Sequence, residues 1–152
     1  MIAAIADQST GIVWIKGGST QTSYVNDTDT TGTSTDYGTG QTNTNAIITQ
    51  AVAASNNDLS TYAAGVCDDY SVTVDSVTYD DWFLPSIDEL AVMKTNLAST
   101  PEDRALYGFA DSYYWSSSEG SAVTAGVQRF GDGYQHYDLK YFMGWVRAVR
   151  AF

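Results

Sequence analysis

The stretch Asp81–Leu90, which reads DWFLPSIDEL, decides the fold because it fixes where a helix begins. Ser86 followed by Glu89 is a capping box, in which each of the two side chains accepts a hydrogen bond from the backbone N–H of the other residue. From Ile87 to Leu97, apolar residues recur at helical spacing. The stretch therefore predicts a helix that begins directly after Ser86.

The first half of the chain predicts strands and then two further helices. The apolar runs Ile2–Ala6 and Gly11–Ile15 predict two strands that could pair as a hairpin. The runs Asn45–Ala54 and Asp58–Asp69 predict a helical hairpin, with Thr44 as the N-cap of the first helix. Between the strands and the helices, residues 19–45 are rich in Thr, Ser and Gly and predict a long polar loop.

The second half combines short elements of both kinds. Ser71–Tyr79 alternates valines around a polar pair and predicts a small hairpin, and Pro101–Asp103 predicts one more helical turn. From Tyr113 onward, short runs punctuated by glycines predict strands up to the end of the chain. The chain of 152 residues is thus expected to be a single α+β domain, with strands at both ends and helices between them.

The charge of the chain narrows the range of partners. The net charge is -11, and such a surface repels phosphate, so we expect neither nucleic acid nor an anionic membrane as a partner. Residues 114–152 differ, with four basic and three acidic residues and nine aromatic ones. No run is long and apolar enough to predict a membrane-spanning helix, and the N-terminus does not have the pattern of a signal peptide.

The residue types argue against a metal, a cofactor or catalysis. Cys67 and His136 are the only cysteine and histidine, too few for a usual zinc site or a recognisable catalytic triad, and no disulfide can form within the chain. Cys67 lies beside an apolar helix face and is expected to be a small buried residue. The segment Asp27–Gly38 begins like a calcium loop but has Gly38 where the bidentate Glu belongs. We therefore expect no metal, no cofactor and no enzymatic activity.

Three strings of sequence, in this order, carry a family resemblance. They are DWFLPS followed by DEL within residues 81–90, YWSSSE at residues 114–119, and VRAVRAF at residues 146–152. Together they resemble the C-terminal domain family named for Legionella collagen-like protein, which implies a C-type-lectin-like fold. Arg147 and Arg150 belong to the last string, and we expect them to be structural, paired with Glu119 or Asp88.

Part of that family resembles the variable proteins of diversity-generating retroelements, in which adenines of a template are randomised and the copy replaces the end of the gene. The resemblance implies a ligand-binding segment at residues 114–152. Randomised Asn codons cannot yield Glu119, Gln128, Gln135 or Lys140, which would then be fixed; Met143 and Trp145 need other template codons. The candidate ligand-binding residues are Gly120, Ser121, Val123, Thr124, Val127, Arg129, Gly131, Asp132, Tyr134, His136, Tyr137, Asp138, Leu139, Tyr141, Phe142, Met143, Gly144 and Trp145.

The composition of residues 133–145 fits such a role, because Tyr and Trp give rigid contact area while Gly, Ser and Asp adapt. The same rings could instead be part of the core. The resemblance implies a protein that lies on a virion or cell surface and binds a protein or glycan receptor on a target cell. The alternative is a structural domain of a tail fibre or surface protein, whose aromatic residues form a homo-oligomer interface.

Overall fold

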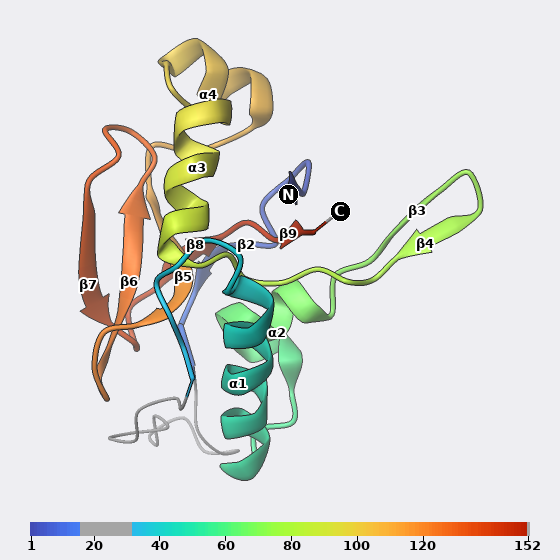
Figure 1. Ribbon diagram of the computed structural model, residues 1–152, viewed down its shortest axis with the longest axis vertical. Helices are drawn as coiled ribbons and strands as arrows, with labels where there is room; N and C mark the ends of the chain where they lie inside the picture. The colour runs from blue at the N-terminus through green and yellow to red at the C-terminus, as the bar shows by residue number, and fades with distance from the viewer. Residues whose placement is uncertain (16–31, 152) are drawn as a thin grey trace.

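The computed structural model of the chain describes residues 1–15 and 32–151 (Figure 1). They form helices and small, mostly antiparallel sheets, so the predicted α+β class is confirmed. Strand β1 (Ile2–Ala3) pairs antiparallel with β9 (Val149–Arg150). The two ends of the described chain therefore lie side by side, as the C-type-lectin-like expectation requires.

The largest sheet among the described residues has five strands in the order β2-β8-β5-β6-β7. These strands are β2 (Ser9–Ile12), β5 (Tyr113–Glu119), β6 (Thr124–Arg129), β7 (Gln135–Leu139) and β8 (Gly144–Val146). Strands β5 and β8 run parallel, and the other neighbours are antiparallel. Because β7 is an edge strand that pairs only with β6 in this sheet, one row of its backbone N–H and C=O groups has no partner strand.

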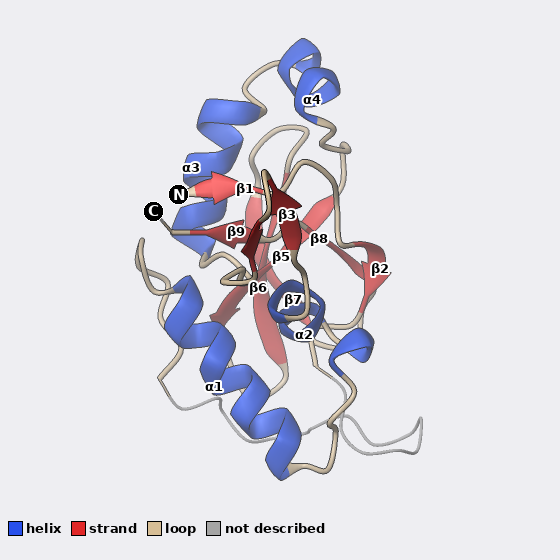
Figure 2. Ribbon diagram, turned by 90° about the vertical axis from the view of Figure 1, so that its right-hand side faces the viewer, coloured by secondary structure: helices blue, strands red, loops and turns tan. Residues whose placement is uncertain are grey.

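The helices divide between the two ends of the molecule. Helix α1 (Gly40–Ala53), the 3-10 turn η1 (Leu59–Thr61) and α2 (Ala63–Asp68) lie at one end of the long axis, and α3 (Ile87–Leu97) and α4 (Pro101–Tyr107) lie at the other (Figures 1 and 2). The sheet passes between these two groups, so it can bury apolar side chains against both.

The core accordingly consists of two hydrophobic clusters. One gathers Trp14 and Ile47 with side chains of α2, and the other gathers Leu90 of α3 with Phe109 and Phe130. Adjacent side chains of a strand point to opposite faces of a sheet. Tyr114 and Trp115 of β5 therefore enter different clusters, and both are almost completely buried.

The two N-terminal strands are present but do not form a hairpin with each other. Strand β1 pairs with β9, and β2 pairs with β8. Between them, Ala4 and Gln8 donate backbone hydrogen bonds to the carbonyls of Ala148 and Val146. The expectation of a hairpin was wrong because both strands share the C-terminal run as their partner.

Helix α1 begins five residues earlier than the sequence indicated. Thr44 lies inside this helix, and its buried hydroxyl accepts a hydrogen bond of 3.0 Å from the backbone N–H of Leu84. The expected N-cap at Thr44 was therefore wrong, and the last part of the predicted polar loop is helical. Residues 19–31 of that loop, which include the first five residues of the calcium-like segment, lie outside the described residues.

The second predicted helix is divided. Asp58 caps η1 with its side chain, and Tyr62 then adopts an extended conformation with φ of −151° before α2 begins. The extended residue interrupts the helical hydrogen bonding, so only Ala63–Asp68 of the region form an α-helix. Cys67 lies in α2 and is fully buried, as expected, and burial raises the pKa of its thiol.

The predictions that depend only on residues close together in the chain are confirmed. The capping box of Ser86 and Glu89 is present at the start of α3. Strands β3 (Val72–Val74) and β4 (Val77–Tyr79) form the predicted hairpin, and Figure 1 shows that it projects far from the body. Helix α4 has Pro101 as its first residue and extends beyond the single turn expected.

Candidate functional site

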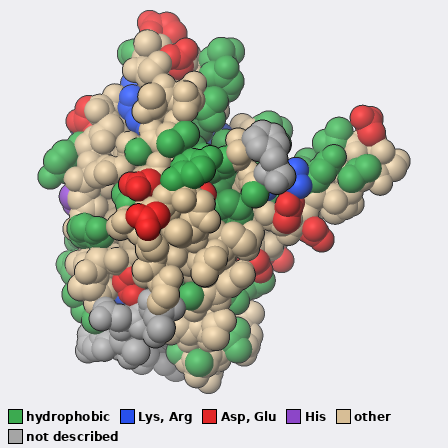
Figure 3. Space-filling model, viewed as in Figure 1, with side chains coloured by type: hydrophobic (Ala, Val, Ile, Leu, Met, Phe, Trp, Pro, Cys, Tyr) green, Lys and Arg blue, Asp and Glu red, His purple; other side chains and the backbone are tan. Residues whose placement is uncertain are grey.

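The most exposed group of aromatic residues in the predicted segment lies on strand β7 and the turns beside it. We call residues 131–143 the β7 edge. Tyr134 and Tyr137 are 59% and 52% exposed, and Tyr141, Phe142 and Met143 follow with exposed side chains. Figure 3 shows hydrophobic side chains along this side of the molecule, next to the histidine. An exposed cluster of this size usually marks an interaction site.

The His136 ring of β7 is in contact with two tyrosine rings, one from the β7 edge and one from β5, on the other side of β6. The Tyr134 ring stacks on the His136 ring with centroids 5.4 Å apart, and the Tyr113 ring meets it edge-on at 5.1 Å. Nε2 of His136 lies 3.7 Å from a carboxylate oxygen of Asp138. Contacts between rings limit their motion, so they present a preformed surface to a ligand.

The segment of residues 114–152 divides into side chains that face solvent and side chains that do not. The exposed candidates are Gly120, Ser121, Val123, Asp132, Tyr134, Tyr137, Tyr141, Phe142 and Met143. The partly buried ones are Thr124, Arg129, Gly131, His136, Asp138, Leu139 and Trp145. Val127 and Gly144 are buried. Sixteen of the candidates thus have surface that a ligand could reach.

Val127 and Gly144 are corrections to the predicted site. Val127 lies in the middle of β6 and packs into the same cluster as Trp115, because a strand inside the sheet is covered on both faces. A side chain at Gly144 would place its Cβ 2.5 Å from the indole nitrogen of Trp115. Neither residue can contact a ligand. Trp145 is also held, since its ring lies 5.9 Å from the buried ring of Tyr114.

The four residues that the codon argument leaves unchanged lie under or beside this surface. The buried Lys140 ammonium forms an ion pair with Glu119, donates a hydrogen bond of 2.7 Å to the carbonyl of Ala122, and lies over the ring of Trp14. This pair joins the end of β5 to the turn after β7.

The second pair joins β7 to the sheet and to α3. The side-chain amide of Gln135 donates hydrogen bonds to the side chain of the buried Gln128 and to the carbonyl of Ile87, each 3.2 Å long. The β7 edge is therefore fastened at both ends by polar contacts, made by the buried Lys140 at one end and by the exposed Gln135 at the other.

Every cation of residues 114–151 is engaged in an ion pair. Besides Lys140, Arg129 pairs with Asp111 and Asp132, Arg147 with Asp7, and Arg150 with Asp81. The partners of Arg147 and Arg150 are therefore not the expected Glu119 and Asp88. Both alternatives lie elsewhere in the fold: Glu119 binds Lys140, and Asp88 lies in the first turn of α3.

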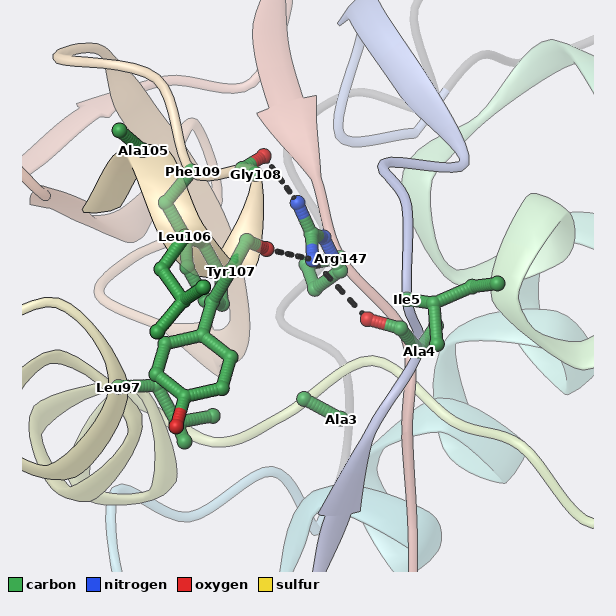
Figure 4. Close-up of a pocket in the computed structure, with 10 residues that line it drawn as sticks. All are labelled: Ala3, Ala4, Ile5, Leu97, Ala105, Leu106, Tyr107, Gly108, Phe109 and Arg147. Atoms are coloured by element: carbon green, nitrogen blue, oxygen red, sulfur yellow. Dashed lines mark hydrogen bonds between the residues drawn. The ribbon is translucent and has the colours of Figure 1, made fainter. Parts of the chain in front are cut away.

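Arg147 has the structural role expected of it. Its side chain is almost fully buried and donates to the carbonyls of Ala4, Tyr107 and Gly108 (Figure 4). Desolvation raises the pKa of its partner Asp7, an effect that the hydrogen bond and the charge of Arg147 oppose. The arginine thus ties both ends of the chain to the residues after α4.

A pocket of about 390 Å³ opens beside this arginine, on the side of the molecule that carries α4. Its wall is mainly apolar, with Ile5, Leu97 and Leu106 among the lining residues. None of the predicted ligand-binding residues lines it. This pocket and the exposed aromatic surface are therefore two separate features.

Two residues outside the predicted segment contribute to the site. Tyr113 is 38% exposed and touches His136, and the carboxylate of Asp111 lies 3.0 Å from Nε of Arg129. Alternation along β5 could not have revealed the first, because it places Tyr113 on the same face as the buried Trp115. No local signal links Asp111 to Arg129.

The part of the chain that the structure describes holds no group of three or more His, Cys, Asp or Glu side chains arranged for a metal ion. It also contains no helix with the length and apolar character needed to cross a bilayer.

Comparison with known proteins completes the description. A search of curated proteins found no significant match to the chain. The family model of the Lcl C-terminal domain, in contrast, matches residues 3–150, which is nearly the whole chain. The chain therefore belongs to the Lcl C-terminal domain family.

Proposed function

We propose that this chain is a ligand-binding protein that displays a diversified surface on a C-type-lectin scaffold, as the variable proteins of diversity-generating retroelements do. The protein would lie on a virion or cell surface and bind a protein or glycan receptor on a target cell. It would act without catalysis and without a cofactor. The observation that carries the proposal is the separation between fixed and exposed side chains in residues 114–151.

This separation is what a diversified surface needs. Glu119, Gln128 and Lys140, which randomised Asn codons cannot produce, are shielded from solvent and hold the β7 edge in place. Gln135, the fourth residue of this set, is exposed, but its side-chain amide is held by hydrogen bonds to Gln128 and Ile87. Tyr134 and Tyr137, which those codons can produce, point into solvent and contribute little to the core. Side chains can then change at the surface while the stability of the fold stays nearly constant.

The proposed absence of catalysis is supported by the surroundings of the histidine. His136 contacts the rings of Tyr113 and Tyr134 and the carboxylate of Asp138. A general base in a nucleophilic triad needs a hydroxyl or thiol within hydrogen-bonding reach. Ring contacts of this kind suit recognition of a ligand by shape and stacking.

The first experiment replaces Tyr134, Tyr137 and Tyr141 together by serine and measures thermal unfolding and binding to panels of immobilised glycans and of whole cells. The matched control replaces the equally exposed Val74 and Val77 on the distant hairpin. We expect the tyrosine variant to melt within a few degrees of the wild type and to lose binding that the control retains. Loss of folding, or equal binding by both variants, would contradict the proposal.

The origin of the diversity is tested in the neighbouring DNA. We expect a near-copy of the sequence that encodes residues 114–152, differing at adenine positions and close to a reverse-transcriptase gene. Differences scattered over all four bases would refute the retroelement part of the proposal and leave the binding part to the first experiment.

The second candidate is a structural domain of a fibre or surface protein, because exposed rings also suit an interface between copies of one chain. Light scattering of the purified chain separates the two. A stable oligomer that dissociates when the three tyrosines are replaced favours the structural role. A monomer that still binds its target favours receptor recognition.

A further inference from the structure

The charges around the β7 edge indicate what kind of ligand it accepts. The sequence of residues 114–152 has one more basic than acidic residue, which by itself would suit an anionic ligand. In the structure all four cations of the segment are paired with carboxylates, and Lys140 and Arg147 are buried as well. The described part of the segment therefore offers no unpaired cation to a phosphate, a sulfate or a carboxylate.

Carboxylates, in contrast, outnumber cations at this edge. Arg129 lies between Asp111 and Asp132, so one positive charge serves two negative ones. The next carboxylate along the edge belongs to Asp138, whose neighbour is His136. Three carboxylates, those of Asp111, Asp132 and Asp138, are therefore present at this edge for the single cation of Arg129, and the net charge of the whole chain is also strongly negative.

The aromatic rings lie among these carboxylates. Asp132 accepts a hydrogen bond of 3.0 Å from the backbone N–H of Tyr134, whose ring stacks on His136, which in turn neighbours Asp138. A tyrosine face attracts a cation through its quadrupole, and the attraction grows where water is partly excluded. Ring faces flanked by carboxylates are therefore suited to a guanidinium or an ammonium group.

We infer that the β7 edge binds a basic segment of a protein, with an Arg or Lys side chain seated against Tyr134 and His136 between Asp132 and Asp138. The inference rests on the proposed function, because it names the chemistry of the ligand for the same surface. Complementary charge would also speed the encounter with a basic partner and make binding weaker at high salt.

The test titrates the isotope-labelled chain with a short, capped glycine peptide that carries two arginines and follows the backbone resonances. The matched ligand replaces both arginines by citrulline, which has almost the same shape but no charge. A heparin oligosaccharide serves as the anionic probe. We expect saturable shifts at residues 132–138 with the arginine peptide, and none there with citrulline or heparin.

Charge variants locate the effect. Asp132→Asn with Asp138→Asn keeps the side-chain oxygens that accept the hydrogen bonds from the backbone N–H groups of Tyr134 and Leu139. The control, Asp75→Asn with Glu102→Gln, removes the same charge from the β3–β4 hairpin and α4. We expect the Asp132→Asn, Asp138→Asn variant to weaken binding of the arginine peptide about two- to fivefold more than the control variant does. Tyr134→Ala should weaken this binding by a similar factor.

Each other outcome has a definite meaning. Equal weakening by both charge variants would show non-specific attraction and overturn the inference, as would binding of citrulline as tight as that of arginine or the absence of shifts at residues 132–138. If a glycan or heparin binds this surface through the tyrosines, the basic ligand is refuted and the proposed function stands. If replacing the tyrosines changes no binding at all, the proposed function itself fails.

Discussion

The buried ion pair between Lys140 and Glu119 gives the sharpest test of how the β7 edge is held. The side chains of Lys140 and Glu119 are only 6% and 4% exposed, so Lys140→Met would leave the Glu119 carboxylate in a site with little water. Breaking a buried pair by removing one partner costs about 3–5 kcal/mol. For a domain of this size, that loss corresponds to a drop of about 6–20 °C in melting temperature.

The double variant separates the lost attraction from the stranded charge. With Glu119→Gln added to Lys140→Met, no uncompensated charge remains, and we expect the double variant to regain at least half of the lost free energy of unfolding. Lys94→Met on the partly buried face of α3 is the control, with an expected change of about 0.5 kcal/mol or less.

The assay is urea unfolding at neutral pH, followed by circular dichroism, for the wild type and the three variants. A Lys140→Met variant that loses less than about 1 kcal/mol would refute the reasoning, because it would mean that water reaches the carboxylate of Glu119. So would a double variant less stable than Lys140→Met alone, since a stranded charge would then not be the cause of the loss.

Three further outcomes are expected. Gly144→Ala should lower the free energy of unfolding by about 1–3 kcal/mol, because the new Cβ would overlap the buried Trp115 ring. Gly120→Ala should change it much less, because its Cβ would meet the exposed Tyr137 ring, which can rotate away. Comparable losses for the two variants in urea unfolding would contradict this. Cys67, buried with a raised pKa, should resist a thiol reagent in the folded chain and react once urea unfolds it, so fast labelling of the native chain would be evidence against that burial. The pKa of Asp81 is lowered by hydrogen bonds from Arg150 of β9. The ionised carboxylate should therefore stabilise the fold fully above the unfolded-state pKa of about 3.9, and this stabilisation should vanish as pH falls through the lower folded-state pKa. A difference in the free energy of unfolding between wild type and Asp81→Asn that persists at about pH 2 would refute this.

Structural features that depend on residues close together in the chain were predicted correctly from the sequence. The capping box at Ser86 and the valine hairpin around Asp75 depend on contacts between residues a few positions apart, and both are present. Partners far apart in the chain were not readable. The strand that pairs with β2, and the carboxylate that pairs with Arg147, are each more than a hundred residues away and are fixed only by the folded topology.

The same limit explains which candidate residues were misplaced. Composition alone could not separate Val127 from Tyr137, since both belong to short strands punctuated by glycine. Strand order separates them, because β6 is covered on both faces while β7 is the edge of the sheet. The edge position was not predicted, and it is what leaves Tyr137 of β7 exposed.

The net charge of a segment of sequence can differ from the charge that the folded segment presents to solvent. Three of the four cations in residues 114–151 pair with carboxylates of the preceding scaffold, namely Asp7, Asp81 and Asp111. The slight positive charge of the segment is therefore used to attach it to the scaffold, and it is not presented to solvent as a basic patch. A ligand meets the net charge that remains after these pairs are made, and at the β7 edge that charge is negative, because the carboxylates of Asp111, Asp132 and Asp138 outnumber the single cation of Arg129. The attachment that fixes the frame thus also determines the sign of charge that a partner must bring.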